Sequence, residues 1–465
     1  MKKTFVFFIL SVFSICMCAA ESSKDESEIH LTATRAMEYA VENSRALKRA
    51  KIELETKQDS VNNALNVFMP TVQVSGTLSR SNKYSTTYAS LLNPLYDALG
   101  SSYRLPTQAS TEADYWTAIG QLSVSYNFNA SMICQIQQTN LDYQSGLISW
   151  DQQVKQTKRD VLKLYYSLLL SQSALENDRQ SLKNAKERYN EALRSYENGT
   201  SPELNVLQSN VNRKNLELQV QKEELQFNEQ LSQFGYVIGL PSDTKIYLEG
   251  SLNDVELYQI DINNFINSFI ANNVDLRLLN NNLASLDSQL LANDLSTFTP
   301  SLSFSYALKP TLYDFDSNWF NPSNWTDAGN FSLTLSWNLT DMLPFSSNRI
   351  KYMNLKKQKQ SLYLSLSDQI DSIKMEAQKI FDEMELARSS ISASEENIRL
   401  AKQSYKLVSE AFANGSVDIL EVRDAQSQLN QAIYNQQNDY FTYITSLIDL
   451  GYLFDLDEKI LEEVQ

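Results

Sequence analysis

The chain has 465 residues, of which 42% are apolar and 21% are charged, and its net charge at pH 7 is −16. Such an acidic balance argues against nucleic acid as a partner, because nucleic-acid binding needs a basic face. With 11 glycines and 9 prolines, the composition favours long regular elements, and no apolar run of about 18 residues marks a membrane-spanning helix.

The N-terminus has the features of an export signal. Two lysines precede the apolar stretch 4–15, and the small residues Cys18-Ala19-Ala20 follow it. This order predicts a signal peptide over residues 1–20. A short buried helix is one alternative, and a lipid anchor on Cys16 or Cys18 is another.

The next part of the chain, residues 21–240, changes its hydrophobic period twice. Thr32 or Thr34 can cap a first helix, and Pro70 ends that helix because proline has no N–H to donate. Alternation with period 2 then predicts two strands separated by a polar loop at about 82–114. The expected elements are a helix over 31–68, strands over 71–81 and 116–128, a long helix over 130–198 and a helix over 203–234.

A mixed linker over 241–261 leads into residues 262–450, where the same order returns. Here Pro300 ends the first helix, as Pro70 does in the first half. The expected elements are a helix over 262–297, strands over 300–309 and 330–340, a long helix over 345–414 and a helix over 418–447, followed by an acidic tail over 451–465.

The longest expected helix, 345–414, has 70 residues without a glycine or a proline. Its apolar residues follow a heptad seam from Leu366 to Phe412, in which 13 of 14 positions are apolar. At 1.5 Å per residue the helix spans roughly 105 Å. Subtracting 216 from each seam position gives a second seam in 130–198, where Thr157, Ser171 and Asp178 are the polar exceptions. The chain is therefore an internal duplication.

The four expected strands carry apolar residues on one face and small neutral residues on the other. In 116–128, for example, Leu122 and Val124 alternate with Ser123 and Ser125. A half-buried soluble sheet would explain this alternation. Strands of about 9–11 residues can also cross an outer membrane. Four strands cannot close a barrel, and an open edge cannot face lipid. Several copies would then share one barrel: two copies give 8 strands, and three, which we favour, give 12 strands with room for water.

Paired local motifs support the duplication and carry a family resemblance. They are Glu42-Asn43-Ser44-Arg45-Ala46-Leu47 with Asn272-Asn273-Val274-Asp275-Leu276, Phe68-Met69-Pro70 with Phe298-Thr299-Pro300, and the turn sequence 415–425. In their order and spacing they resemble the TolC family of trimeric outer-membrane efflux channels over essentially the whole mature chain. The resemblance implies a 12-stranded barrel above a periplasmic helical tunnel, an inner-membrane pump and a periplasmic adaptor protein as partners.

The resemblance also implies functional residues near the two helical turns. Glu421 and Asp424 match an acidic pair that narrows the tunnel mouth in that family, and their spacing places both on one helix face. In a trimer they would form a ring of six carboxylates. The alternative is an ordinary solvated helix face, where Arg423 can pair locally. The resemblance implies adaptor contacts for the turn residues Asn198, Gly199 and Thr200 and their counterparts Asn414, Gly415 and Ser416.

Together these features predict a mainly α-helical fold with a small β part, built from a duplicated helix–strand–strand–helix unit. Three copies would form an α-helical barrel and a shared membrane β-barrel in contact with outer-membrane lipid. The expected function is a passive exit duct for efflux or type I secretion, in the outer membrane with a periplasmic extension. A structural or adhesive periplasmic coiled coil is the alternative. With one histidine, His30, and no glycine-rich phosphate loop, we expect no catalytic site, no metal and no cofactor.

Overall fold

The computed structural model describes residues 28–83, 87–107, 111–241, 244–257, 262–312, 317–414 and 416–456. The predicted signal peptide 1–20 and positions 457–465 of the predicted tail lie outside these ranges. The chain forms two compact units, and each unit takes segments from both sequence repeats. The first unit contains 1–44, 160–256 and 387–445, and the second contains 45–159, 257–386 and 446–465.

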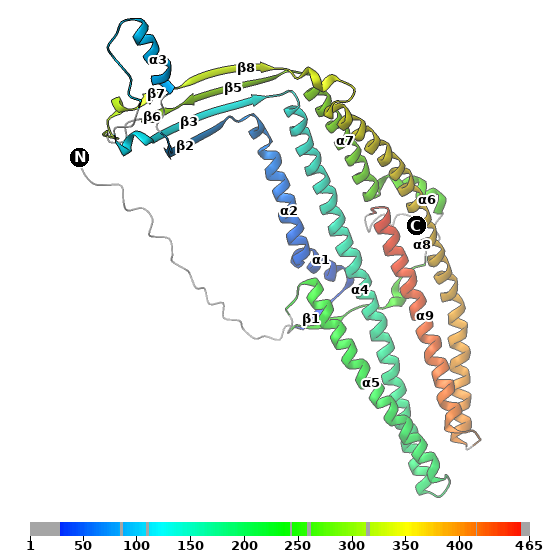
Figure 1. The fold of residues 1–465 in the computed structure, drawn as a ribbon. Coiled ribbons are helices and arrows are strands. Elements are labelled where there is room, and N and C mark those ends of the chain that lie inside the picture. Colours follow the sequence, from blue (N-terminus) through cyan, green and yellow to red (C-terminus); the bar gives the residue numbers. More distant parts are fainter. Residues whose placement is uncertain are drawn as a thin grey trace. The chain divides into compact units, whose positions relative to one another are not determined.

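The elements of the first half (Figure 1) are β1 (Glu28–Leu31), α1 (Ala33–Asn43), α2 (Arg45–Asn62), β2 (Thr71–Arg80), α3 (Thr87–Ala98), β3 (Trp116–Phe128), α4 (Met132–Glu197), α5 (Glu203–Ile238) and β4 (Lys245–Leu248). Those of the second half are α6 (Ile262–Phe269), α7 (Val274–Phe298), β5 (Ser301–Leu308), β6 (Pro310–Leu312), β7 (Thr326–Asp327), β8 (Asn330–Ser336), α8 (Ser347–Ala413) and α9 (Ile419–Leu453). The mainly helical fold with a small β part is confirmed.

The helix expected over 31–68 is wrong at its beginning, in its middle and at its end, where α2 stops at Asn62 and a 3₁₀ helix follows at Ala64–Phe68. Leu31 ends the strand β1, and Thr32 caps α1 by accepting a hydrogen bond from the Arg35 N–H. The helix then breaks at Ser44, whose φ of −55° and ψ of 122° lie outside the helical region. Asn and Ser are weak helix formers, because their side chains compete for backbone groups. The break therefore divides one expected helix into α1 and α2.

The helix expected over 262–297 breaks in the same way. Asn273 has φ −52° and ψ 130°, close to the values at Ser44. Its side chain caps α7 by accepting hydrogen bonds from the N–H groups of Asp275 and Leu276. Both repeats thus interrupt their first helix at equivalent positions.

Other boundaries also differ from expectation. The polar loop at 82–114 contains the helix α3, which accommodates Pro94 in its interior. The helix expected over 203–234 extends to Ile238, and the one expected over 418–447 extends to Leu453, into the predicted tail. The strand expected over 330–340 ends at Ser336, where a short 3₁₀ turn follows at Leu339–Met342.

The first unit is closed by a small parallel sheet that the sequence did not indicate. β1 pairs with β4 from Glu28 to Leu31. Tyr165 of α4 is 1% exposed, and its single O–H points to the carbonyl oxygens of Leu31 and Glu249, which share it as acceptors. Burial raises the pKa of Tyr165 to about 12. A neutral phenol is therefore held against the backbone on both sides of this sheet.

The heptad seams of the two long helices are buried in part: the middle of the α8 seam is buried, whereas Leu164 and Tyr196 of the α4 seam are exposed. The buried seam residues of α8 are Ile373, Ala377, Ile380, Met384, Ala387 and Ile391, and those of α4 are Val161, Leu168, Leu175, Leu182, Ala185 and Ala192. In the first unit Leu175 and Leu182 pack with Val220 of α5, which pairs the long helix with the one that follows it.

The end of α5 depends on a glycine. Gly239 has φ 83°, and a Cβ at this position would lie 2.6 Å from the Cβ of Asn43. We expect Gly239→Ala to lower the free energy of unfolding by about 1–3 kcal/mol, from backbone strain alone, and further through this contact. Gly199→Ala is the matched control, because Gly199 has φ 73° but open space around it. Urea unfolding of both variants tests this, and equal losses would contradict a role for the Asn43 contact.

The second unit contains the antiparallel sheet β2-β3-β5-β8 (Figure 1). Two short strands extend it: β6 pairs with the beginning of β3, and β7 pairs with β6. Its register pairs Val72 with Val124 and Val124 with Tyr306, so apolar residues share one face. On the other face the hydroxyls of Ser305 and Ser332 lie 2.7 Å apart. The two-faced sheet of the sequence prediction is therefore formed across all four strands.

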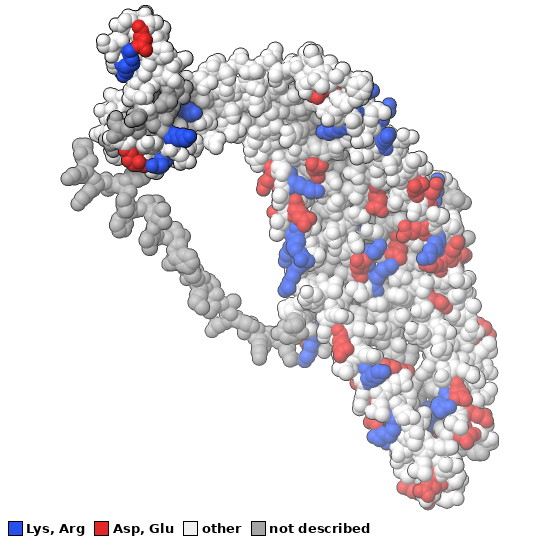
Figure 2. Space-filling model, viewed as in Figure 1, with Lys and Arg blue, Asp and Glu red and all other residues white. Residues whose placement is uncertain are grey.

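The apolar face of this sheet is exposed in the single chain. Val74 is 77% exposed, Leu333 62% and Leu335 70%. Arg80, at the end of β2, is the one charged residue in the four strands. Figure 2 accordingly shows Lys, Arg, Asp and Glu spread over the helices but absent from most of the visible sheet surface. Within the described ranges, no helix is both long enough and apolar enough to cross a bilayer.

Candidate functional site

The predicted acidic pair lies at the beginning of α9. The Asp418 side chain caps this helix by accepting a hydrogen bond from the Leu420 N–H at 3.0 Å. Val422 is fully buried, so α9 turns this face toward the protein. Glu421 and Asp424 lie on the exposed side, one turn apart. In the first turn, a carboxylate such as Glu421 is also favoured by the positive end of the helix dipole.

Asp424 is not a free carboxylate. Arg423 Nη2 lies 3.2 Å from Asp424 Oδ1, and their side chains are 56% and 65% exposed. The local pairing that the sequence made possible is present. Exposed pairs of this kind are weak, yet Arg423 offsets part of the charge of Asp424. Of the two predicted acidic residues, Glu421 therefore presents the less compensated charge.

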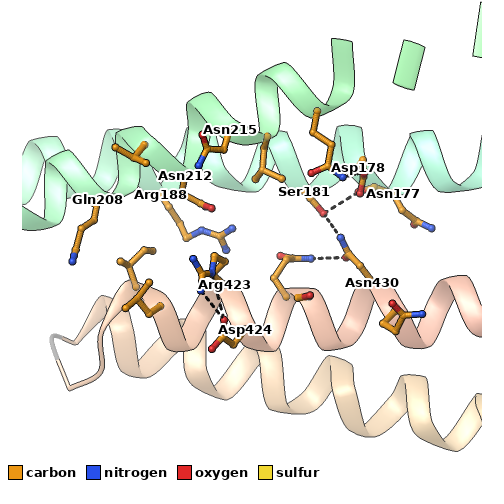
Figure 3. A pocket seen from close by; sticks show the side chains of 18 of the residues that line it. Asn177, Asp178, Ser181, Arg188, Gln208, Asn212, Asn215, Arg423, Asp424 and Asn430 are labelled. Carbon is orange, nitrogen blue, oxygen red and sulfur yellow. Dashed lines mark hydrogen bonds and ion pairs between the residues drawn. The ribbon is translucent and has the colours of Figure 1, made fainter. Parts of the chain in front are cut away.

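A cavity of about 950 Å³ lies beside the acidic pair, between α4, α5 and the first turns of α9 (Figure 3). Arg423 and Asp424 line it, whereas Glu421 does not. Amides are the most frequent of the other lining side chains: Asn177, Gln208, Asn212, Asn215, Gln219, Gln426, Asn430 and Gln431. The sequence did not point to this cavity, because its walls combine α4 and α5 of the first repeat with α9 of the second.

Two carboxyl groups, Asp178 and Glu223, lie close together on the wall of the cavity. Burial raises the pKa of Glu223, and the hydrogen bond with Asp178 raises it further. Gln219 Nε2 donates to both, at 2.7 Å to Asp178 and 3.1 Å to Glu223. Asp178 was a polar exception in the seam of α4, so the sequence did contain one signal of this group.

Polar contacts join the α4–α5 hairpin to the α8–α9 hairpin within the first unit. Asn430 Nδ2 donates to Ser181 Oγ at 2.9 Å, and Arg188 Nη1 donates to the hydroxyl of Tyr405 at 2.6 Å. Around the cavity, the buried atoms Gln208 Oε1 and Gln426 Oε1 have no hydrogen-bond partner in the described structure. Polar contacts thus contribute to the packing of the two hairpins around this cavity.

The two predicted tips are tight turns. Gly199 takes a left-handed conformation, and the Thr200 N–H closes the turn on the Ser195 carbonyl at 2.8 Å. In the second turn the Ser416 N–H bonds to the Ala411 carbonyl at 2.9 Å, while Gly415 lies outside the described residues. Both turns end their long helices with the same hydrogen bond, so the duplication extends to the tips.

Comparison with known proteins identifies the class of this chain. The model of the outer membrane efflux protein family matches residues 36–234 and 265–450, one segment in each repeat. Among solved structures, the CmeC outer membrane channel of Campylobacter jejuni is 14% identical, with a TM-score of 0.69 over 96% of this chain and 94% of its own. The open-state MtrE outer membrane channel of Neisseria gonorrhoeae is 13% identical, with a TM-score of 0.67 over 91% and 89% of the two chains.

VceC, an outer membrane protein of Vibrio cholerae, is 13% identical, with a TM-score of 0.66 over 90% of this chain and 94% of its own. No curated sequence matches the chain significantly. Structural likeness at this identity shows the fold alone, but the family match covers most of the chain.

The chain therefore belongs to the outer membrane efflux protein family. It is an outer-membrane efflux component with a helical periplasmic extension, as the sequence predicted. This family is one of channels, and it gives no support to the alternative of an adhesive coiled coil.

Proposed function

We propose that three copies of this chain form one continuous duct, with a shared 12-stranded barrel in the outer membrane and a helical tunnel below it. The observation that carries this proposal is a sheet with an exposed apolar face and two open edges. Among the described residues, β2 pairs only with β3, and β8 only with β5. Open edges in lipid would leave N–H and C=O groups without partners, so neighbouring copies must supply them.

Three copies fit the chemistry of the polar face better than two. A barrel of 8 strands is filled by its own side chains. The inward face here carries serine, threonine and glutamine, and Ser301 and Ser336 hydrogen-bond to each other at 2.8 Å across strands. A 12-stranded barrel leaves these hydroxyls in contact with water. No nucleotide motif occurs in the sequence, so an inner-membrane pump, joined through a periplasmic adaptor at the two tips, would supply the energy.

The purified protein should form cation-preferring pores in planar bilayers. Repeated reconstitutions without conductance, from a protein that chromatographs as a trimer, would contradict the duct.

The constriction is proposed to lie at the ring formed by Glu421 and Asp424. We expect Glu421→Gln to lower the cation preference more than Asp424→Asn, because Arg423 already offsets part of the Asp424 charge. Arg423→Gln should raise the cation preference for the same reason. The reversal potential under a salt gradient measures all three.

Glu203→Gln is the matched control for the ring, since Glu203 occupies the first turn of α5, the equivalent helix of the first repeat. Its ion preference should equal that of the unmodified channel. If Glu421→Gln and Glu203→Gln behave alike, the narrowest charged point lies elsewhere.

A further inference from the structure

The ends of α5 and α9 are equivalent in the duplication and share one backbone motif. The Leu240 N–H bonds to the Gly235 carbonyl and the Leu456 N–H to the Gly451 carbonyl, both at 2.9 Å. Such a closure needs a left-handed residue just before its last residue. In α5 that residue is Gly239, with φ 83°. In α9 it is Asp455, with φ 56°, the one non-glycine residue with positive φ among those described.

A residue other than glycine has a conformational cost in the left-handed region. The contacts of the Asp455 side chain can offset this cost. Asp455 is only 10% exposed. Its carboxylate pairs with Lys155 of α4 and lies 3.2 Å from Arg277 Nη1 of α7. Asp151 completes the group, 2.9 Å from Lys155 and 3.8 Å from Arg277. We call these four residues the Asp455 cluster.

The four charges of the Asp455 cluster sum to zero, but the four side chains are not equally buried. Lys155, Arg277 and Asp151 are 32–41% exposed and can draw on water, whereas Asp455 has little access to it. Burial alone would lower the pKa of Lys155, but its hydrogen bonds to Asp455 and Asp151 raise it above the ordinary value. Asp455 therefore depends on both cations, while each cation depends less on Asp455.

Neutral contacts hold the same helix end. Asn273, 5% exposed, donates from Nδ2 to the Leu453 carbonyl at 2.8 Å. Phe454 is fully buried and meets the Phe265 ring edge-on at 5.3 Å. The end of α9 is thus fastened to α4, α6 and α7 of the second unit. The other end of this continuous helix carries Glu421 and Asp424.

We propose that Asp455 is a positioning residue, which fixes the C-terminal end of α9 against α4 and α7 and thereby the helix that carries the acidic pair. Its effect on conduction rests on the proposed duct, whereas the anchoring itself does not. The equivalent end of α5 is positioned by close backbone packing at Gly239 instead. The two repeats therefore hold the ends of their last helices by different means: α5 by van der Waals contact at Gly239, and α9 by the ion pairs of Asp455.

Hydrogen exchange of the full-length protein in detergent tests the anchor directly. Asp455→Asn removes the charge but keeps a residue that tolerates the left-handed region. We expect the amides of 446–456 to exchange about tenfold faster, because hydrogen bonds to charged groups stabilise by more than neutral ones. The amides of 235–241 are the internal control and should not change.

Lys155→Met should accelerate exchange of 446–456 more than Asp455→Asn, because it leaves a nearly buried carboxylate with one cation. The double variant Lys155→Met/Asp455→Asn should exchange more slowly than Lys155→Met alone. If the two substitutions had additive effects on the exchange rate of 446–456, or if Asp455→Asn left that rate unchanged, the proposed anchoring role of Asp455 would be wrong. Slower exchange in Asp455→Gly than in the unmodified protein would also contradict this role, since backbone relaxation would then outweigh the lost ion pairs.

Single-channel recording separates positioning from stability alone. In Asp455→Asn the conductance should fluctuate between more levels, while Lys379→Ala, which removes an exposed side chain of α8 outside the Asp455 cluster, should keep the conductance pattern of the unmodified protein. Faster exchange with unchanged conductance would show an anchor that does not position the acidic pair, and would overturn the proposal. If neither the variants nor the unmodified protein conducts ions, the proposed duct is wrong, but the exchange rates still test whether Asp455 anchors the end of α9.

Discussion

Lys379→Pro is expected to destabilise the protein by about 3 kcal/mol or more and to kink α8 near its middle. Lys379 lies in the uninterrupted helix Ser347–Ala413, and its side chain is 75% exposed. Proline there removes one backbone hydrogen bond and its ring clashes with the carbonyl four residues earlier. Because the side chain is exposed, little packing is lost. The urea midpoint and the amount of assembled trimer in the outer membrane measure the effect.

Lys379→Ala is the matched control, since it removes the same side chain and its weak pair with Glu383 but keeps the helix. Its stability should stay within about 0.5 kcal/mol of the unmodified protein, as for most surface substitutions. If Lys379→Pro assembled and conducted like Lys379→Ala, a continuous α8 would not be required for the duct.

Val124→Arg is the second substitution with a large expected effect. Val124 lies in the middle of β3, between Val72 and Tyr306 on the apolar face. If this face contacts lipid, arginine there should cost about 2–4 kcal/mol near the bilayer midplane. Unfolding in lipid vesicles measures the loss, and the fraction of detergent-resistant trimer should fall with it.

Ser125→Arg tests the opposite face of the same strand. Ser125 is paired with Thr71 and Ser305 and faces the proposed water-filled interior. We expect assembly to be retained and conductance to fall, because the added side chains occupy the lumen. A Val124→Arg variant as stable as Ser125→Arg would mean that the apolar face does not meet lipid.

Long-range periodicity was the most informative property of the sequence. The seams of α4 and α8 followed from apolar spacing, and six of the 14 seam positions in each helix are buried. The four strands followed from alternation, because a residue that changes face every step leaves a clear signal. Features set by single residues were harder to predict. Nothing in the local pattern separated Ser44 and Asn273 from the helices around them, and α3 was hidden by Pro94 in a polar segment.

The candidate site also has a part that the sequence predicts and a part that it does not. Glu421 and Asp424 could be placed on one exposed helix face because i, i+3 geometry is local. The cavity beside them could not be predicted, since Asn177 and Asn430 meet there only through packing of two hairpins. The raised pKa of Glu223 likewise depends on burial and on the neighbouring Asp178, which only this packing brings about.

The sequence by itself determined the duplication, the helix and strand types and the family, because each depends on the order of residues along the chain. Only the tertiary structure decided where the first helices break, which edges of the sheet remain open and how Asp455 is paired. Those features arise where segments distant in sequence compete for the same space and the same charges, and no local pattern encodes that competition.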